Sequence, residues 1–320
     1  ESMGQDVRRR AIVWRQVIVG LVMCGCVASW SCATEPPPWE VEDPIRPLGP
    51  PPLGLELYFE DAKQTPDPER VRLGRWLFYD KRLSGDNTVA CATCHRPEHA
   101  FSEPTPVSSG VGGQRGKRKA PTFINQAVTL QPHFFWDGRA GSLEDQALGP
   151  IENPIEMGNT HTSMIETLSR IEGYRPYFEE AFGTAEITKG SVALALADYE
   201  RTRVSGNSGY DRWRYNRDES AVPEEAKVGY GLFFGKARCS QCHVGDNFTD
   251  SLFHNIGVGW NAETQTFADD GRFIVTNDPA DRGAFKTPTL REVTRRAPYM
   301  HDGSVATLRE AVEIYNRGGR

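Results

Sequence analysis

Beyond residue 32, the 320-residue chain contains no cysteine outside two CxxCH motifs. No pair is left over for a disulfide, which argues against a disulfide-stapled scaffold for the folded part. The chain also lacks an excess of basic residues, since its net charge is −6 and its pI is about 5.7. This balance argues against a nucleic-acid binder or a polybasic membrane binder, and leaves small molecules or a basic protein as partners.

Long hydrophobic runs are missing too, apart from one near the N-terminus. The apolar stretch 17–28 follows three arginines at 8–10 and is short for a membrane span, which needs about 20 residues. A basic segment before a short apolar run is typical of an export signal, so residues 1–32 are predicted to direct the chain to the periplasm. A lipoprotein anchor stays open, because three cysteines of this segment could accept a lipid: Cys24, Cys26 and Cys32.

The two CxxCH motifs lie at residues 91–95 and 239–243. Their spacing lets both thiols form thioethers to the vinyl groups of one haem while the adjacent histidine reaches its iron. CxxC pairs also bind zinc, but the histidine in both copies and the predicted export signal disfavour a zinc site. The sequence therefore predicts two covalently bound haem c groups, held by Cys91, Cys94 and His95 and by Cys239, Cys242 and His243.

The folded part contains a weak internal repeat. Residues 72–81 and 227–236 share glycine, leucine, phenylalanine and lysine at matching positions, and each copy predicts a short helix that leads into a CxxCH motif. We therefore expect a mainly α fold with two cytochrome c-type haem domains, residues 66–215 and 216–320, joined by long connecting loops. The proline-rich residues 33–65 are expected to form an extended tether before them.

Two further segments have a clear local pattern. Residues 245–290 are rich in glycine, aspartate, asparagine and proline and predict loops, and strand patterns are few and short throughout. Residues 187–203 predict a helix, and its apolar face carries Val192, Ala195, Leu196 and Tyr199.

The second axial ligand of each iron decides what a haem does. His99 lies too close to His95 in the chain to reach the opposite face of the same iron. Methionine as the second ligand raises the reduction potential and favours electron transfer, whereas a tyrosinate lowers it. The residues alone leave this choice open for the second haem, with Tyr299, Met300 and Tyr315 as candidates. Three isolated histidines are expected in loops or at the surface: His133, His161 and His254.

Four stretches resemble the bacterial dihaem cytochrome c peroxidase family, which includes a MauG-type branch: residues 77–95, 134–158, 200–208 and 285–319. The resemblance implies that hydrogen peroxide reacts at the N-terminal haem and that the C-terminal haem delivers electrons. It also implies that Trp136 lies between the haems and that Gln146 and Glu156 belong to the peroxide pocket. One carboxylate in a tight pocket can act first as base and then as acid in peroxide cleavage, which agrees with the role implied for Glu156.

The same resemblance bears on the branch. In many members a histidine from the loop after the first haem motif closes the N-terminal iron, but here residues 98–119 contain only His99. The sixth ligand of the second haem follows an HDG motif and is methionine in those members and tyrosine in the MauG branch, and here Tyr315 takes that place. Family members also continue for some tens of residues past this ligand, so residues 216–320 are expected to be a truncated domain.

A calcium ion between the haems is possible but disfavoured. The family binds it through an asparagine, and here Lys119 stands at that position with a charge that cannot ligate calcium. Only the carbonyls of Arg296 and Pro298 would remain as ligands.

We therefore expect a peroxidase that takes electrons from a cytochrome c or cupredoxin. The alternatives are a MauG-type oxidase of a protein substrate that works through high-valent dihaem iron, and a non-catalytic dihaem electron-transfer cytochrome.

Overall fold

The computed structural model describes residues 43–46, 48–56, 65–126 and 133–319. The predicted export signal, its three cysteines and most of the predicted tether lie outside these residues. Within the described part, no helix is long and apolar enough to cross a membrane. All described residues belong to one compact unit, Asp43–Arg320, so the boundary between residues 215 and 216 stays a prediction.

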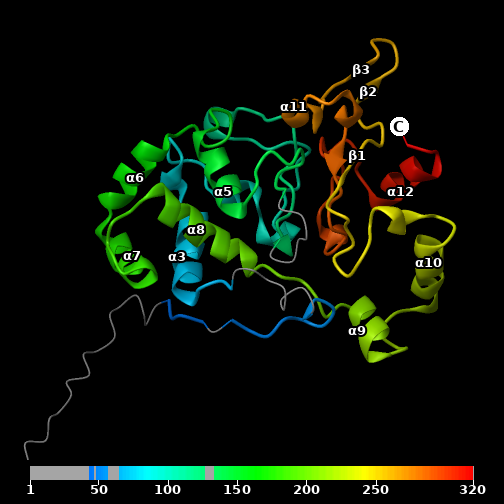
Figure 1. Cartoon of the computed structure of the whole chain (residues 1–320), viewed down its shortest axis with the longest axis horizontal. Helices are drawn as coiled ribbons and strands as arrows, with labels where there is room; N and C mark the ends of the chain where they lie inside the picture. The colour runs from blue at the N-terminus through cyan, green and yellow to red at the C-terminus, as the bar shows by residue number, and fades with distance from the viewer. Residues whose placement is uncertain (1–42, 47, 57–64, 127–132, 320) are drawn as a thin grey trace, which may run out of the picture. The chain divides into compact units, whose positions relative to one another are not determined.

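Helices of the N-terminal half gather around α3 (Pro68–Tyr79) and α8 (Lys189–Arg201), which pack against each other (Figure 1). The ring of Phe78 on α3 lies 5.0 Å from that of Tyr199 on α8, measured between centroids, and both side chains are buried. Helices α4 (Cys91–Cys94) and α7 (Arg175–Phe182) contact α3, α5 (Leu143–Glu152) contacts α8, and α6 (His161–Ser169) contacts α5.

Helix α8 forms where the sequence predicts a helix. Its N-terminus is capped by Thr188 and Ser191, because each side-chain oxygen accepts a hydrogen bond from the backbone N–H of the other residue. Leu194, which lies off the predicted apolar face, is only partly buried. The residues of that face are at most 2% exposed, which confirms the prediction: Val192, Ala195, Leu196 and Tyr199.

Gly74 lets α3 approach α8 until backbone meets backbone. A Cβ atom at this position would lie 1.9 Å from the carbonyl oxygen of Ala195, which is far too close for any real contact. Gly229, the matching glycine of the second repeat, lies on α10 (Glu224–Phe234), and a Cβ atom there would meet nothing within 4 Å. Both copies of the repeat keep the glycine, but only the first copy needs it for packing.

Gly74→Ala is expected to lower the free energy of unfolding by about 1–3 kcal/mol or more, because α3 and α8 must separate to admit the methyl group. The matched variant Gly229→Ala is expected to raise it by up to about 1 kcal/mol, since alanine favours a helix more than glycine does. Denaturant unfolding of both variants measures the difference. Equal effects of the two substitutions would contradict the packing described for Gly74.

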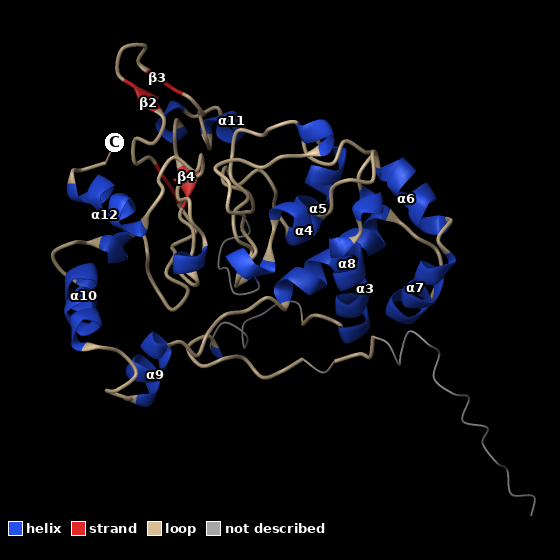
Figure 2. Ribbon diagram, turned by 180° about the vertical axis from the view of Figure 1, so that it is seen from behind, coloured by secondary structure: helices blue, strands red, loops and turns tan. Residues whose placement is uncertain are grey.

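The C-terminal half consists mostly of loops between short elements (Figure 2). Strands occur there as two antiparallel pairs, β1 (Phe253–His254) with β4 (Phe285–Lys286) and β2 (Trp260–Asn261) with β3 (Thr266–Phe267). A mainly α fold with long loops is thus confirmed for the described residues. The helices of this half are α9 (Gly209–Asn216), α10, α11 (Phe273–Thr276) and α12 (Leu308–Asn316).

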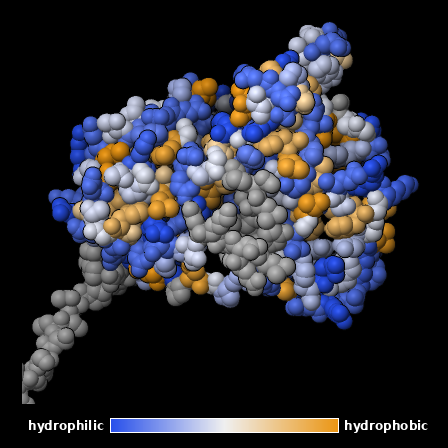
Figure 3. All heavy atoms as spheres, viewed as in Figure 1, coloured by the Kyte–Doolittle hydropathy of each residue, from blue (hydrophilic) through white to orange (hydrophobic). Residues whose placement is uncertain are grey.

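The two halves differ in how much apolar surface they bury. Leu77 on α3 is fully buried, whereas its repeat partner Leu232 on α10 is 50% exposed, and α10 contains no buried residue. On α12 only Ile314 is buried. Hydrophilic side chains cover most of the face drawn in Figure 3, with smaller apolar patches between them. The predicted helices of both repeats are confirmed, but their surroundings are not alike.

Candidate haem sites

One cavity of about 940 Å³ is lined by both CxxCH motifs. Its volume lies at the upper end of the usual range for small-molecule and cofactor pockets. The structure therefore brings together all the site residues that the sequence predicts, although they come from distant parts of the chain: Cys91, Cys94, His95, Trp136, Gln146, Glu156, Cys239, Cys242, His243 and Tyr315.

The first motif begins on the short helix α4, whose single turn sets Cys91 and Cys94 one helical turn apart. His95 follows directly, and its Nδ1 donates a hydrogen bond to the carbonyl oxygen of Phe101 at 3.0 Å. This bond fixes the tautomer and leaves Nε2 free to bind a metal. Burial also lowers the pKa of His95, which favours the neutral imidazole that iron requires.

The second motif repeats this arrangement on a 3₁₀ turn, Cys239–Gln241. The Nδ1 of His243 donates to the carbonyl oxygen of Phe248, again at 3.0 Å, and burial lowers the pKa of this histidine as well. Both histidines thus present Nε2 as the free ring nitrogen, beside a pair of free thiols, on the wall of one large cavity. The residues present fit two covalently attached haems.

Glu156 lies just after α5 and is held by its own loop. The side chain of Asn153 donates to its Oε1 at 2.9 Å, and the backbone N–H of Val111 donates to its carbonyl oxygen at 2.9 Å. Burial raises the pKa of Glu156, and the positive charge of Arg139 partly opposes this rise. Gln146, on α5, lines the same cavity. The hydrogen bond from Asn153 therefore fixes the position of the carboxyl group, and burial makes this group less acidic than that of an exposed glutamate.

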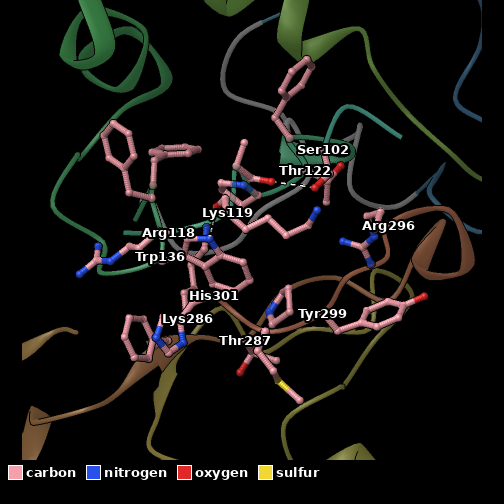
Figure 4. A pocket seen from close by; sticks show the side chains of 18 of the residues that line it. Ser102, Arg118, Lys119, Thr122, Trp136, Lys286, Thr287, Arg296, Tyr299 and His301 are labelled. Atoms are coloured by element: carbon pink, nitrogen blue, oxygen red, sulfur yellow. Dashed lines mark hydrogen bonds between the residues drawn. The ribbon is translucent and has the colours of Figure 1, made fainter. Parts of the chain in front are cut away.

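Trp136 is fixed from two sides. Its indole Nε1 donates to the carbonyl oxygen of Lys119 at 2.8 Å, and its own carbonyl oxygen accepts from the backbone N–H of Lys286 at 2.8 Å. Lys119 belongs to the N-terminal half, and Lys286 ends strand β4 of the C-terminal half. The indole thus lies where the two halves meet on the cavity wall (Figure 4).

The three candidates for the second axial position all line the cavity, but they differ in what they bind. The hydroxyl of Tyr299 donates to the carbonyl oxygen of Val293 at 3.1 Å. Tyr315 lies on α12, is 52% exposed, and has a hydroxyl whose pKa is raised by burial and by the nearby thiols of Cys242 and Cys239. Tyr315 is thus close to the second motif, and its hydroxyl, unlike that of Tyr299, forms no hydrogen bond with another described residue.

The histidines outside the motifs divide into two groups. His99, His133 and His161 are not among the residues that line the cavity in the described part of the chain. His254 differs from the expectation, because it lies in strand β1, lines the cavity and binds Asp250 at 2.7 Å. The pairing of β1 with β4, which sequence pattern does not reveal, brings it there. His301 lines the cavity as well, stacked on the ring of Phe285.

Glu200 is a cavity residue that the sequence interpretation did not single out. It is 6% exposed, its Oε2 has no hydrogen-bond partner among the described residues, and burial raises its pKa to about 8. A signal existed, since Glu200 lies four residues after Leu196 and so continues the apolar face of α8. A charged residue on such a face indicates a buried carboxyl group.

Comparison with known proteins agrees with this site. Residues 68–220 match the model of the family described as di-haem cytochrome c peroxidase. The chain is 42% identical to the methylamine utilization protein MauG of Methylorubrum extorquens, an alignment that covers 79% of this chain and 70% of that protein. It is 39% identical to the cytochrome c551 peroxidase of Nitrosomonas europaea, over 79% of this chain and 75% of that one.

Among solved structures, the chain resembles a MauG-like protein associated with microbial copper homeostasis. The TM-score is 0.73 and the identity 33%, and the match covers 86% of this chain and 82% of the other. The fold, the two CxxCH motifs on one cavity and these similarities lead to one conclusion: the chain belongs to the dihaem cytochrome c peroxidase family and is MauG-like.

Proposed function

We propose that this chain is a periplasmic dihaem peroxidase that reduces hydrogen peroxide with electrons from a small redox protein, either a cytochrome c or a cupredoxin. The observation that carries the proposal is the shared cavity, because both CxxCH motifs and the predicted catalytic side chains line it. When bound, the two haems supply iron that cleaves peroxide and passes electrons. His243 and Tyr315 would hold the iron of the second haem.

Glu156 is proposed to handle the peroxide proton. Cleavage of the O–O bond requires that a proton leave one oxygen and reach the other, which departs as water. The carboxylate can accept the first proton and return it, and burial, which raises its pKa, makes it a better proton acceptor than an exposed glutamate. The amide of Gln146, on the same wall, can donate a hydrogen bond to a peroxide oxygen.

Trp136 is proposed to couple the two sites. Its hydrogen bonds to Lys119 and Lys286 hold the indole at the junction of the two halves. An oxidisable ring at that point can pass electrons from the C-terminal site to the N-terminal one. The electrons themselves come from the redox partner, and each peroxide consumes a pair of them as it is reduced to water.

Two observations favour oxidation of a protein side chain as a second candidate function. No histidine of residues 98–119 lines the cavity in the described part of the chain, so this loop offers no ligand that would close the first site. Tyr315 lies beside the second motif, as the resemblance to the MauG branch implies. The remaining alternative, a non-catalytic electron-transfer cytochrome, would need a second protein ligand for the iron of each haem.

Steady-state oxidation of a reduced small cytochrome c or cupredoxin by peroxide tests the proposed function. We expect turnover in the wild type, and Trp136→Phe should slow oxidation of the donor while leaving the first reaction with peroxide nearly unchanged. Trp260→Phe is the matched control, because Trp260 is 40% exposed on β2 and is not among the residues that line the cavity. Absence of donor oxidation in the wild type, with every donor of both classes, would refute the peroxidase assignment.

A further inference from the structure

Two basic side chains on the cavity wall are buried without an acidic partner. Lys119 is 4% exposed and Arg296 is 7% exposed, yet neither forms an ion pair with an aspartate or glutamate of the described residues. Buried charges are normally paired, because transfer out of water is costly for an uncompensated ion. Their presence therefore calls for an explanation.

The two cations face each other across the pocket (Figure 4). The ammonium of Lys119 donates to the carbonyl oxygen of Glu103, and Nη2 of Arg296 donates to the carbonyl oxygen of Thr289 at 2.5 Å. The Nε of Arg296 is buried and has no hydrogen-bond partner among the described residues. Each cation is thus only partly satisfied by neutral carbonyl groups.

Burial disfavours the charged form of both side chains. It lowers the pKa of Lys119 to about 8, the Glu103 carboxylate opposes this change, and the charge of Arg296 adds a smaller lowering. Burial lowers the pKa of Arg296 to about 10 as well, against the opposing effects of Tyr299 and Glu292. Two buried cations on one cavity wall are stabilised when an anion lies between or beside them.

The nearby acidic groups are engaged elsewhere. Oε1 of Glu103 accepts from the hydroxyl of Ser108 at 2.5 Å and from the backbone N–H of Ala120 at 2.6 Å. The carboxylate of Glu292 accepts from the hydroxyl of Ser205 at 2.7 Å and forms an ion pair with Arg295 at 3.4 Å. A ligand that carries an anion would supply the acidic partner that these two cations lack among the described residues.

We propose that Lys119 and Arg296 form a carboxylate-binding site for a haem propionate. The inference rests on the proposed function, because it requires haem in the cavity. A haem that is attached to CxxCH through its vinyl groups carries two carboxylates on another edge, and a buried carboxylate needs cationic donors. Lys119 lines the same cavity as both motifs, and its backbone binds Trp136 and His301. Its ammonium also supplies the positive charge at the position where the family resemblance implied calcium.

Spectroelectrochemical titration of the two-haem protein tests this assignment. Lys119→Met and Arg296→Met are each expected to lower the midpoint potential of at least one haem, because an uncompensated propionate favours the ferric state. The expected shift changes the ratio of reduced to oxidised haem at least tenfold, which is about 59 mV for one electron. Lys119→Arg, which keeps the charge, is expected to restore the wild-type potential.

Arg115→Met is the matched control, since Arg115 is exposed and does not line the cavity. Potentials of Lys119→Met and Arg296→Met that match this control would overturn the proposal. If Lys119→Met does not fold, Lys119→Gln takes its place, and the midpoint potentials of Lys119→Gln and Arg296→Met are compared with the control in the same way.

Two additions to the wild-type protein separate a haem carboxylate from other ions. Added inorganic phosphate at constant ionic strength, and a calcium chelator, are both expected to leave the potentials unchanged. A shift with phosphate would show that the site takes a free anion, and a shift with the chelator would show a bound calcium ion, so either would overturn the proposal. A protein without covalent haem would instead refute the proposed function, which the spectrum reveals before any titration.

Discussion

Replacing Glu156 with glutamine is expected to lower the second-order rate constant for reaction with hydrogen peroxide by about 10²- to 10⁴-fold. Glutamine keeps the size of the side chain and an oxygen that can accept from Asn153, but it cannot take up and return a proton. Stopped-flow absorbance of the haem bands measures the rate constant directly.

The matched control is Glu152→Gln, an exposed carboxylate at the end of α5 that interacts with His161 instead of the cavity. This variant should react with peroxide at the wild-type rate. A Glu156→Gln variant that reacts as fast as the control would remove Glu156 from the mechanism, and a water molecule or another group would have to carry the proton.

The pH dependence of the same reaction follows from the pKa of Glu156. The carboxylate is the proton acceptor, so the rate should fall as the pH is lowered through that pKa. Because burial raises the pKa above the ordinary glutamate value, the fall should begin at a higher pH than an exposed carboxylate would give. Glu156→Gln should lose this acidic limb. An unchanged limb in the variant would assign it to a different group.

Replacement of both thiols of one motif is expected to halve the covalent haem content. The wild-type chain should retain two haems after denaturation, and Cys91→Ser/Cys94→Ser should retain one and lose its reaction with peroxide. Cys239→Ser/Cys242→Ser should also retain one haem, namely the haem attached to Cys91 and Cys94. Mass spectrometry of the denatured chain gives the count whether or not a variant folds, and a wild-type chain that carries zinc and no haem would contradict both assignments.

The haem motifs could be predicted from the sequence because their chemistry is local. Most contacts around them could not, because they depend on tertiary packing. The spacing within CxxCH is a property of five consecutive residues, so the sequence sufficed to propose both attachment sites. The hydrogen bonds from His95 to Phe101 and from His243 to Phe248 depend on how the following loop folds back. No periodic pattern encodes such a fold.

The internal repeat also shows that matching residues in the sequence need not have matching contacts in the structure. Gly74 and Gly229 match in sequence and both lie on helices, but only Gly74 faces the backbone of a second helix. The position of Lys119 near Arg296 could not be predicted either, because the two residues are 177 positions apart in the chain. By contrast, the buried carboxyl group of Glu200 could have been predicted from the apolar face of α8, which it continues.

The absorption and EPR spectra of the ferric two-haem protein, before and after stoichiometric hydrogen peroxide, test the central claim most directly. The account predicts a high-spin haem beside a low-spin one, and a reaction with peroxide that needs no prior reduction, since no histidine of residues 98–119 lines the cavity. Two low-spin haems that ignore peroxide until one is reduced would contradict it. That result would mean that another ligand closes the His95 site.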